Sequence, residues 1–271
     1  MLSSILNRLP LGNTEPLLDE ATRNWILDTF AWAISEFDLA VFKQDTQLIL
    51  PINKFYPGTV SSIEEMAQSV FDNTLKYAGM QNWPVRLVSP NQFVQKPMPK
   101  LGFVNGMRGS SNQVINNDFS QTNSGEILVS YNPQQINQPQ DLVASFAQVF
   151  ASILIAQRGV LPPGGEKFVP QAVDLVACFM GFGVMFANTA YQFKGGCGSC
   201  YNKHANREVA LPEQEIVYGL AVFAVLKGIK QKEVSYYLKS HLRSDFNKAY
   251  KELTKSSGSD QLENIKRLTT S

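Results

Sequence analysis

Residues 140–157, QDLVASFAQVFASILIAQ, and residues 169–191, VPQAVDLVACFMGFGVMFANTAY, form two long apolar segments joined by the turn-rich RGVLPPGGEKF. The first segment repeats large apolar residues at helical spacing: Leu142, Phe146, Val149, Phe150, Ile153 and Leu154. This period predicts a buried helix, and the second segment predicts another. Gly181 and Gly183 are expected to let the second helix pack closely against the first.

A membrane hairpin is the alternative for these segments, because residues 172–191 approach the roughly 20 apolar positions of a spanning helix. Asp174 and Asn188 interrupt that run, and Gln148 and Ser152 lie in the middle of the first segment. A flanking pattern of positive charge is also missing. The sequence therefore favours core helices, and we expect no membrane partner.

Two motifs in these segments carry a resemblance. LVASFAQVFAS, residues 142–152, resembles the active-site helix of zincin-type metallopeptidase-like bacterial proteins, in which LVATLAHELAH-like sequences carry HExxH. Residues 174–188 resemble the next helix of these uncharacterised glutamate-zincin-type families. LILPINKFYPG (48–58) and LPEQEIVYGLAVFAVLKG (211–228) are similar to further family segments, so the resemblance covers most of the chain.

The resemblance implies a zinc site whose ligands this chain lacks. The two His positions of HExxH are occupied by Gln148 and Ser152, and the general-base position by Val149. The expected third ligand, a Glu four residues before Asp174, is replaced by Pro170. Amide and hydroxyl groups are poor zinc ligands, and valine cannot transfer a proton. We therefore expect a degenerate HExxH site with no catalytic residue, metal or cofactor, in which Asp174 survives as a hydrogen-bond acceptor.

The other elements follow from local signals. One helix is predicted at 16–42. A second begins at a capping box, Ser61–Glu64 or Ser62–Glu65, and ends at Gly79, and a third runs from Pro212 to Gly228. Residues 230–267 are predicted to contain an amphipathic helix pair. Strands are predicted at 46–51, 85–88, 101–104, 113–115 and 126–131. The resemblance implies that strand 127–130 edges a substrate cleft, although an ordinary sheet strand explains the same residues.

These elements predict an α+β, mainly helical fold: a zincin-like core with a small mixed or antiparallel sheet and long buried helices. We expect one domain over residues 1–271. Its parts are N-terminal helices with the sheet (16–136), the degenerate active-site helix pair (137–194) and C-terminal helices (195–271).

A second place for chemistry is QFKGGCGSCYNKHANRE, residues 192–208. Cys197, Cys200 and His204 have CxxC and CxxxH spacings that suit a metal or a thiol/disulfide pair. Structural zinc requires four ligands, and the remaining Cys and His residues are Cys178 and the distant His241. The favoured interpretation is inert loop cysteines, with a metal or redox centre as the alternative.

Charge excludes several partners. The chain has 24 Lys and Arg against 23 Asp and Glu, net +1, which gives no reason to expect nucleic acid or a membrane surface. Three cysteines and an N-terminus without a signal-peptide apolar region predict a cytoplasmic protein. The leading hypothesis is a pseudoenzyme that binds a protein or peptide through its retained cleft or its surface. The alternative is an enzyme, or a metal or redox protein, built on Cys197, Cys200 and His204.

Overall fold

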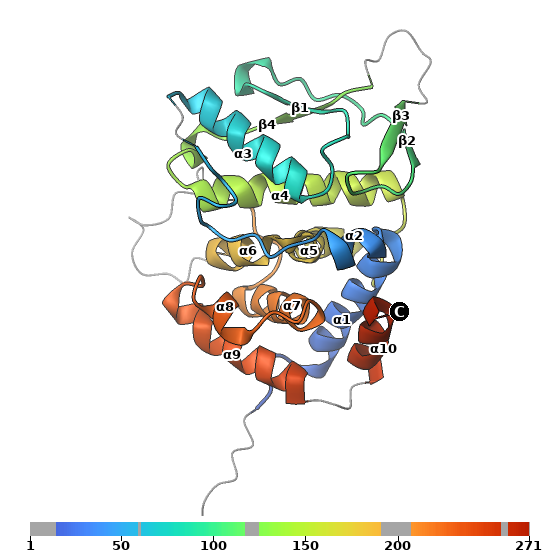
Figure 1. Cartoon of the computed structure of the whole chain (residues 1–271), viewed down its shortest axis with the longest axis vertical. Helices are drawn as coiled ribbons and strands as arrows, with labels where there is room; N and C mark the ends of the chain where they lie inside the picture. Colours follow the sequence, from blue (N-terminus) through green and yellow to red (C-terminus); the bar gives the residue numbers. More distant parts are fainter. Residues whose placement is uncertain (1–14, 59–60, 117–124, 191–206, 256–259, 271) are drawn as a thin grey trace, which may run out of the picture.

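The computed structural model describes residues 15–58, 61–116, 125–190, 207–255 and 260–270, and it has the expected α+β, mainly helical class (Figure 1). Its helices are α1 (Glu20–Glu36), α2 (Leu39–Gln44), α3 (Ile63–Tyr77), α4 (Pro139–Arg158), α5 (Val169–Ala177), α6 (Gly183–Thr189), α7 (Glu213–Leu226), α8 (Gln231–Ser235), α9 (Ser240–Lys255) and α10 (Asp260–Thr270). The strands are β1 (Val85–Val88), β2 (Leu101–Val104), β3 (Gln113–Asn116) and β4 (Ile127–Ser130). Short 3-10 turns lie at Pro90–Gln92, Pro133–Gln135 and Glu166–Phe168.

The elements are stacked in layers on either side of α4. The strands and α3 lie on one side of α4, and α5 and α6 lie on the other, followed by α7 and then α9 (Figure 1). One hydrophobic core extends through these layers, from Ile26 in α1 to Ile265 in α10. Of the apolar positions that repeat along α4, all are buried except Val149, which is 36% exposed. The period of the first segment thus predicted the helix and its buried face.

The second apolar segment is not one continuous helix. α5 passes through a π-helical turn, Cys178–Phe182, into α6, and Gly181 in that turn has φ +100°. The carbonyl of Gly181 accepts a hydrogen bond of 2.9 Å from Ile49 N, and a Cβ at Gly181 would lie 2.0 Å from the carbonyl oxygen of Gln47. Segment 46–51, predicted as a strand, is therefore an extended stretch bound to this turn. Gly183 faces Leu220 of α7, so the expectation that both glycines pack against α4 is wrong.

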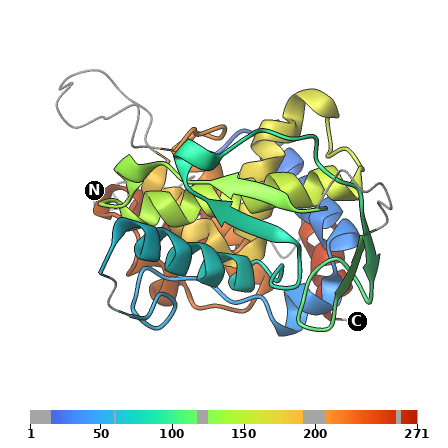
Figure 2. The same cartoon turned by 90° about the horizontal axis from the view of Figure 1, so that it is seen from above.

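The predicted strands form two separate pairs. β1 and β4 pair in parallel with Val85 opposite Ile127, whereas β2 and β3 are antiparallel with Leu101 opposite Asn116. Seen from above, β1 and β4 lie over α4 (Figure 2). The last strand therefore borders the helix that carries the HExxH-like positions.

The predicted first helix divides into α1 and α2 at Asp38, which has φ +60°. The side chain of Asp38 explains this break, because its Oδ2 accepts hydrogen bonds from the backbone N–H groups of Met107 and Arg108 at 2.9 and 2.8 Å. α1 starts at Glu20, and its N-cap is Asp19, whose Oδ1 accepts a hydrogen bond from the N–H of Thr22. The predicted start at Pro16 was therefore too early.

Two helical stretches, Pro139–Arg158 and Glu166–Thr189, are long and apolar enough to cross a membrane. They are 61% and 78% buried inside the protein over their apolar windows, as core helices of soluble proteins are. α7 is also apolar all round, and it is buried between α6, α1 and α9.

Candidate functional site

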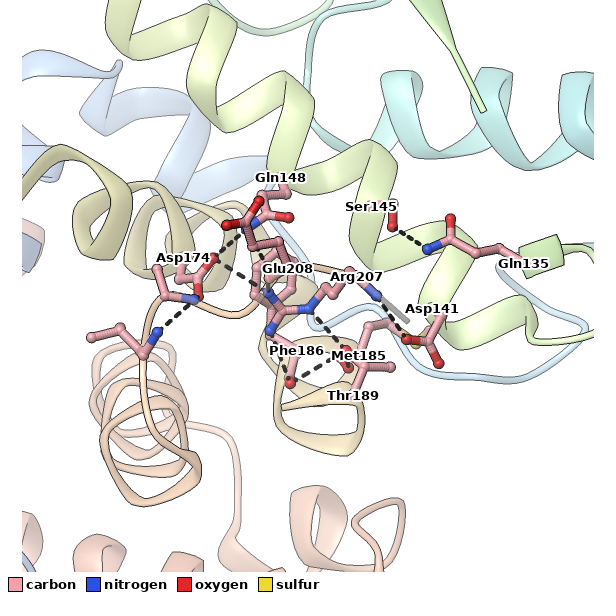
Figure 3. A network of polar contacts seen from close by, with 12 residues as sticks. Gln135, Asp141, Ser145, Gln148, Asp174, Met185, Phe186, Thr189, Arg207 and Glu208 are labelled. Atoms are coloured by element: carbon pink, nitrogen blue, oxygen red, sulfur yellow. Dashed lines mark hydrogen bonds and ion pairs between the residues drawn. The ribbon is translucent and has the colours of Figure 1, made fainter. Parts of the chain in front are cut away.

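The positions inferred from the resemblance meet in space. Gln148, Val149 and Ser152 of α4 and Pro170 of α5 line one open hollow of about 530 Å³. The opposite wall consists of Glu208–Ala210, a segment that crosses the site before α7. Asp174 lies beside Gln148 with its side chain completely buried (Figure 3).

Asp174 is surrounded by hydrogen-bond donors. Its Oδ1 accepts from Gln148 Nε2 at 2.9 Å and from Arg207 Nη1 at 3.4 Å. Its Oδ2 accepts from the backbone N–H groups of Ala210 and Leu211 at 3.1 and 3.2 Å. Burial raises the pKa of the Asp174 carboxyl, while Arg207 and the amide donors oppose that rise. Asp174 therefore fixes residues 207–211, here called the strap, against α4 and α5.

Arg207 is the counter-ion, and its side chain is 1% exposed. Its Nε donates to Thr189 Oγ1 at 3.0 Å, and its Nη2 donates to the carbonyl of Phe186 at 3.4 Å (Figure 3). The guanidinium carbon lies 4.1 Å from the centre of the Phe186 ring, a cation–π contact. Burial lowers the pKa of Arg207, and Asp174 opposes that change.

Arg207 was not predicted from the sequence, although it lies in the stretch 192–208 that also contains Cys197, Cys200 and His204. It is 33 residues from Asp174, and no period or motif pairs the two. The one available signal was Asp174 itself, because a carboxylate within an apolar helix requires a partner.

The side chain of Gln148 acts in the site as a hydrogen-bond donor, not as a metal ligand. Gln148 Nε2 donates to Asp174 and also to the carbonyl of Glu208 at 2.9 Å. Val149 and Pro170 offer no ligand or proton-transfer group. Across the described ranges, no three His, Cys, Asp or Glu side chains are grouped so that they could hold a metal ion.

The hollow continues in both directions. On one side it shares Val149 and Ser152 with a hollow of about 400 Å³, which is lined by residues 126–130 of the β4 region and by residues 93–99. On the other side it shares Gln171 and Ala210 with a hollow of about 410 Å³ between α1, α5 and α7. Because neighbouring hollows share lining residues, they lie next to one another across α4 and α5, and this row of three hollows is called the groove.

The second predicted centre is not described by the structure. Cys197, Cys200 and His204 fall outside the described residues. Cys178 is a free thiol buried in the π-helical turn, and burial raises its pKa, which suppresses the reactive thiolate. His241 lies on α9, where its Nε2 is 3.3 Å from Glu213 Oε1.

Comparison with protein-family models, with characterised proteins and with solved structures gives no match to this chain. The interpretation of the site therefore depends on the geometry of its residues.

Proposed function

We propose that this chain is a catalytically inactive, zincin-like protein of the cytoplasm that binds an extended peptide segment of a partner protein along β4. The observation that carries the proposal is the outer edge of β4, with which no other described strand pairs and which lines the groove beside the degenerate HExxH positions. The burial of both long apolar helices and the low cysteine content support a soluble, cytoplasmic protein.

The backbone N–H and C=O groups of successive residues in β4 point alternately to its two edges. Ile127 N donates to the carbonyl of Pro84 at 2.8 Å, so Ile127 and Val129 direct their backbone groups to β1. By the two-residue period of a strand, Leu128 and Ser130 direct theirs to the opposite edge. No other described strand pairs with that edge. A peptide added there would satisfy these groups, as in β-strand addition.

The wall opposite this edge is mainly apolar, with Gln95 and Lys96 as its polar members. Phe93, Val94 and Met98 are exposed, and together with Val149 they line the hollow beside β4. Exposed apolar groups next to unpaired strand groups suit the alternating side chains of an extended peptide. They do not identify its sequence.

The same geometry supports binding without hydrolysis. The donor at Gln148 is already bonded to Asp174 and Glu208, and a general base is missing at Val149. A variant that carries Gln148→His, Val149→Glu, Ser152→His and Pro170→Glu, hereafter the restored-site variant, would reintroduce the ligands and the base.

The proposal is tested with fluorescent, randomised decapeptide pools and the full chain, measured by anisotropy. Leu128→Pro removes a free-edge N–H without touching the pairing with β1, so binding should fall about tenfold or more. Val94→Asp should also weaken binding, because it puts a charge in the apolar wall. Leu161→Asp is the matched control, since Leu161 is 57% exposed, close to the 61% of Val94, but lies outside the groove. Equal binding by all four proteins, or none by the natural chain, would contradict the proposal.

A further inference from the structure

We propose that the groove ends in a subsite for a cationic group of the bound peptide, formed by Trp25, Phe168, Gln171 and Glu215. The inference rests on the proposed function, since it names the chemistry of the peptide that the groove would take. The subsite is the hollow of about 410 Å³ where α1, α5 and α7 meet, beyond the strap.

Glu215 supplies a carboxylate without a partner. It lies in the first turn of α7, lines the hollow and is half-buried, and no described residue forms a hydrogen bond or ion pair with its side chain. Burial raises the pKa of Glu215, and the neighbouring charge that acts on it is a second carboxylate, Asp19, which raises it further. A cation in this hollow would relieve both effects.

Two aromatic rings form a wall of the same hollow. The ring centres of Trp25 and Phe168 are 5.4 Å apart at an interplanar angle of 39°. Trp25 Nε1 donates to the carbonyl of Pro163 at 2.9 Å, which fixes the orientation of the indole. Aromatic faces attract ammonium and guanidinium groups, and indole does so most strongly.

Gln171 adds an unsatisfied acceptor. Its Oε1 is buried and has no hydrogen-bond partner among the described residues, although buried polar atoms are normally paired. Gln171 also lines both this hollow and the one over the HExxH-like positions, so a peptide that crosses the site passes it. If the Gln171 side chain turned toward the hollow, an N–H donor of the ligand would satisfy this oxygen.

These three observations select one ligand chemistry. A carboxylate, a carbonyl acceptor and an aromatic face together bind an ammonium or guanidinium group. An acidic side chain would be repelled by Glu215 and Asp19, and an aliphatic one would leave Glu215 and Gln171 without partners. The cation could belong to a Lys or Arg side chain or to the amino terminus of the peptide.

The experiment compares decapeptide pools that differ at one fixed residue. Three N-acetylated, C-amidated pools carry Lys, norleucine or Glu at that position, and a fourth carries norleucine with a free amino terminus. Anisotropy titrations use the full chain, Glu215→Gln and Glu213→Gln. Glu213 is the matched control, because it lies on the same turn of α7, loses the same charge and does not line the hollow.

The natural chain and Glu213→Gln should bind the Lys pool about tenfold more tightly than the norleucine pool. Glu215→Gln should abolish this preference, mainly by weakening the binding of the Lys pool. Tighter binding of the fourth pool than of the Lys pool would also support the subsite and assign it to the terminal ammonium. Equal affinity for the Lys pool, the norleucine pool and the fourth pool, with binding still lost in Leu128→Pro, would overturn the subsite and leave the proposed function standing. If no pool binds the natural chain more tightly than it binds Leu128→Pro, both the proposed function and the subsite are refuted.

Discussion

The buried pair of Asp174 and Arg207 should determine the stability of the site. We consider Asp174→Asn, Arg207→Met and the double substitution. Every polar group that bonds to the Asp174 carboxylate is a donor, from Gln148, Arg207 and two backbone amides. Asparagine has nearly the same shape, but its NH2 group must face one of these donors. At least one buried donor then loses its partner.

The expected loss of unfolding free energy follows from these donors and from the buried charges. Breaking one side of a buried ion pair costs about 3–5 kcal/mol, so Asp174→Asn should lower the free energy of unfolding by about that amount. Arg207→Met should cost less, about 2–3 kcal/mol, because three donors remain for the carboxyl and burial favours its protonation. The double variant has no uncompensated charge. It should therefore be more stable than the sum of the single effects predicts, by about 1–3 kcal/mol.

The assay is urea denaturation at pH 7, followed by far-UV circular dichroism and tryptophan fluorescence on all four proteins. The Glu36–Arg158 pair is the control, since it has a shorter contact of 2.7 Å but its side chains are 20% and 43% exposed. The cycle of Glu36→Gln and Arg158→Met should give a coupling below about 1 kcal/mol. Effects of Asp174→Asn and Arg207→Met that simply add would refute the reasoning, because they would show that the two charges do not depend on each other.

Three further predictions concern neighbouring features. Gly181→Ala should lose about 3 kcal/mol or more of unfolding free energy, because its Cβ would meet the Gln47 carbonyl. Gly228→Ala, at φ +64° in open space, should lose only about 1 kcal/mol, and equal urea midpoints would contradict this. The restored-site variant should bind zinc weakly and cleave no peptide, because Asp174 is already hydrogen-bonded to the strap. Zinc affinity is measured by competition with a chelating dye. Tight zinc binding together with peptide hydrolysis would show that the strap can be displaced. The pKa of Glu215 is raised in the folded state, so ionisation of Glu215 costs stability. As pH rises above about 4.5, Glu215→Gln should therefore become more stable relative to the natural chain, until this difference in stability levels off. Denaturation midpoints of the two proteins that stay parallel from pH 4 to 8 would exclude this.

The sequence predicts those elements whose signals are local. The apolar period gives α4, β-prone runs give all four strands, and Ser62 caps α3 while Glu65 reaches back to the N–H of Ser61. The convergence of Gln148 and Ser152 also follows from helical spacing.

Features imposed by distant contacts could not be predicted. The break at Asp38 depends on two backbone amides about 70 residues away, and the break at Gly181 depends on the segment around Ile49. The strap is positioned by Arg207, which no motif connects to Asp174. The resemblance indicated which residues could form a site, but it could not show what covers them.

The contact between the two ends of the chain has a consequence for biosynthesis. Leu17 N donates to Glu252 Oε1 across 235 residues, and α1 packs against α7 and α10. At about 5–20 residues per second, a ribosome needs roughly 10–50 s to make the partners that α1 awaits. During that interval α4 and α5 have emerged without α7, and their apolar faces are open to the solvent. We therefore expect chaperones that recognise apolar segments to bind the nascent chain until its last third has been synthesised.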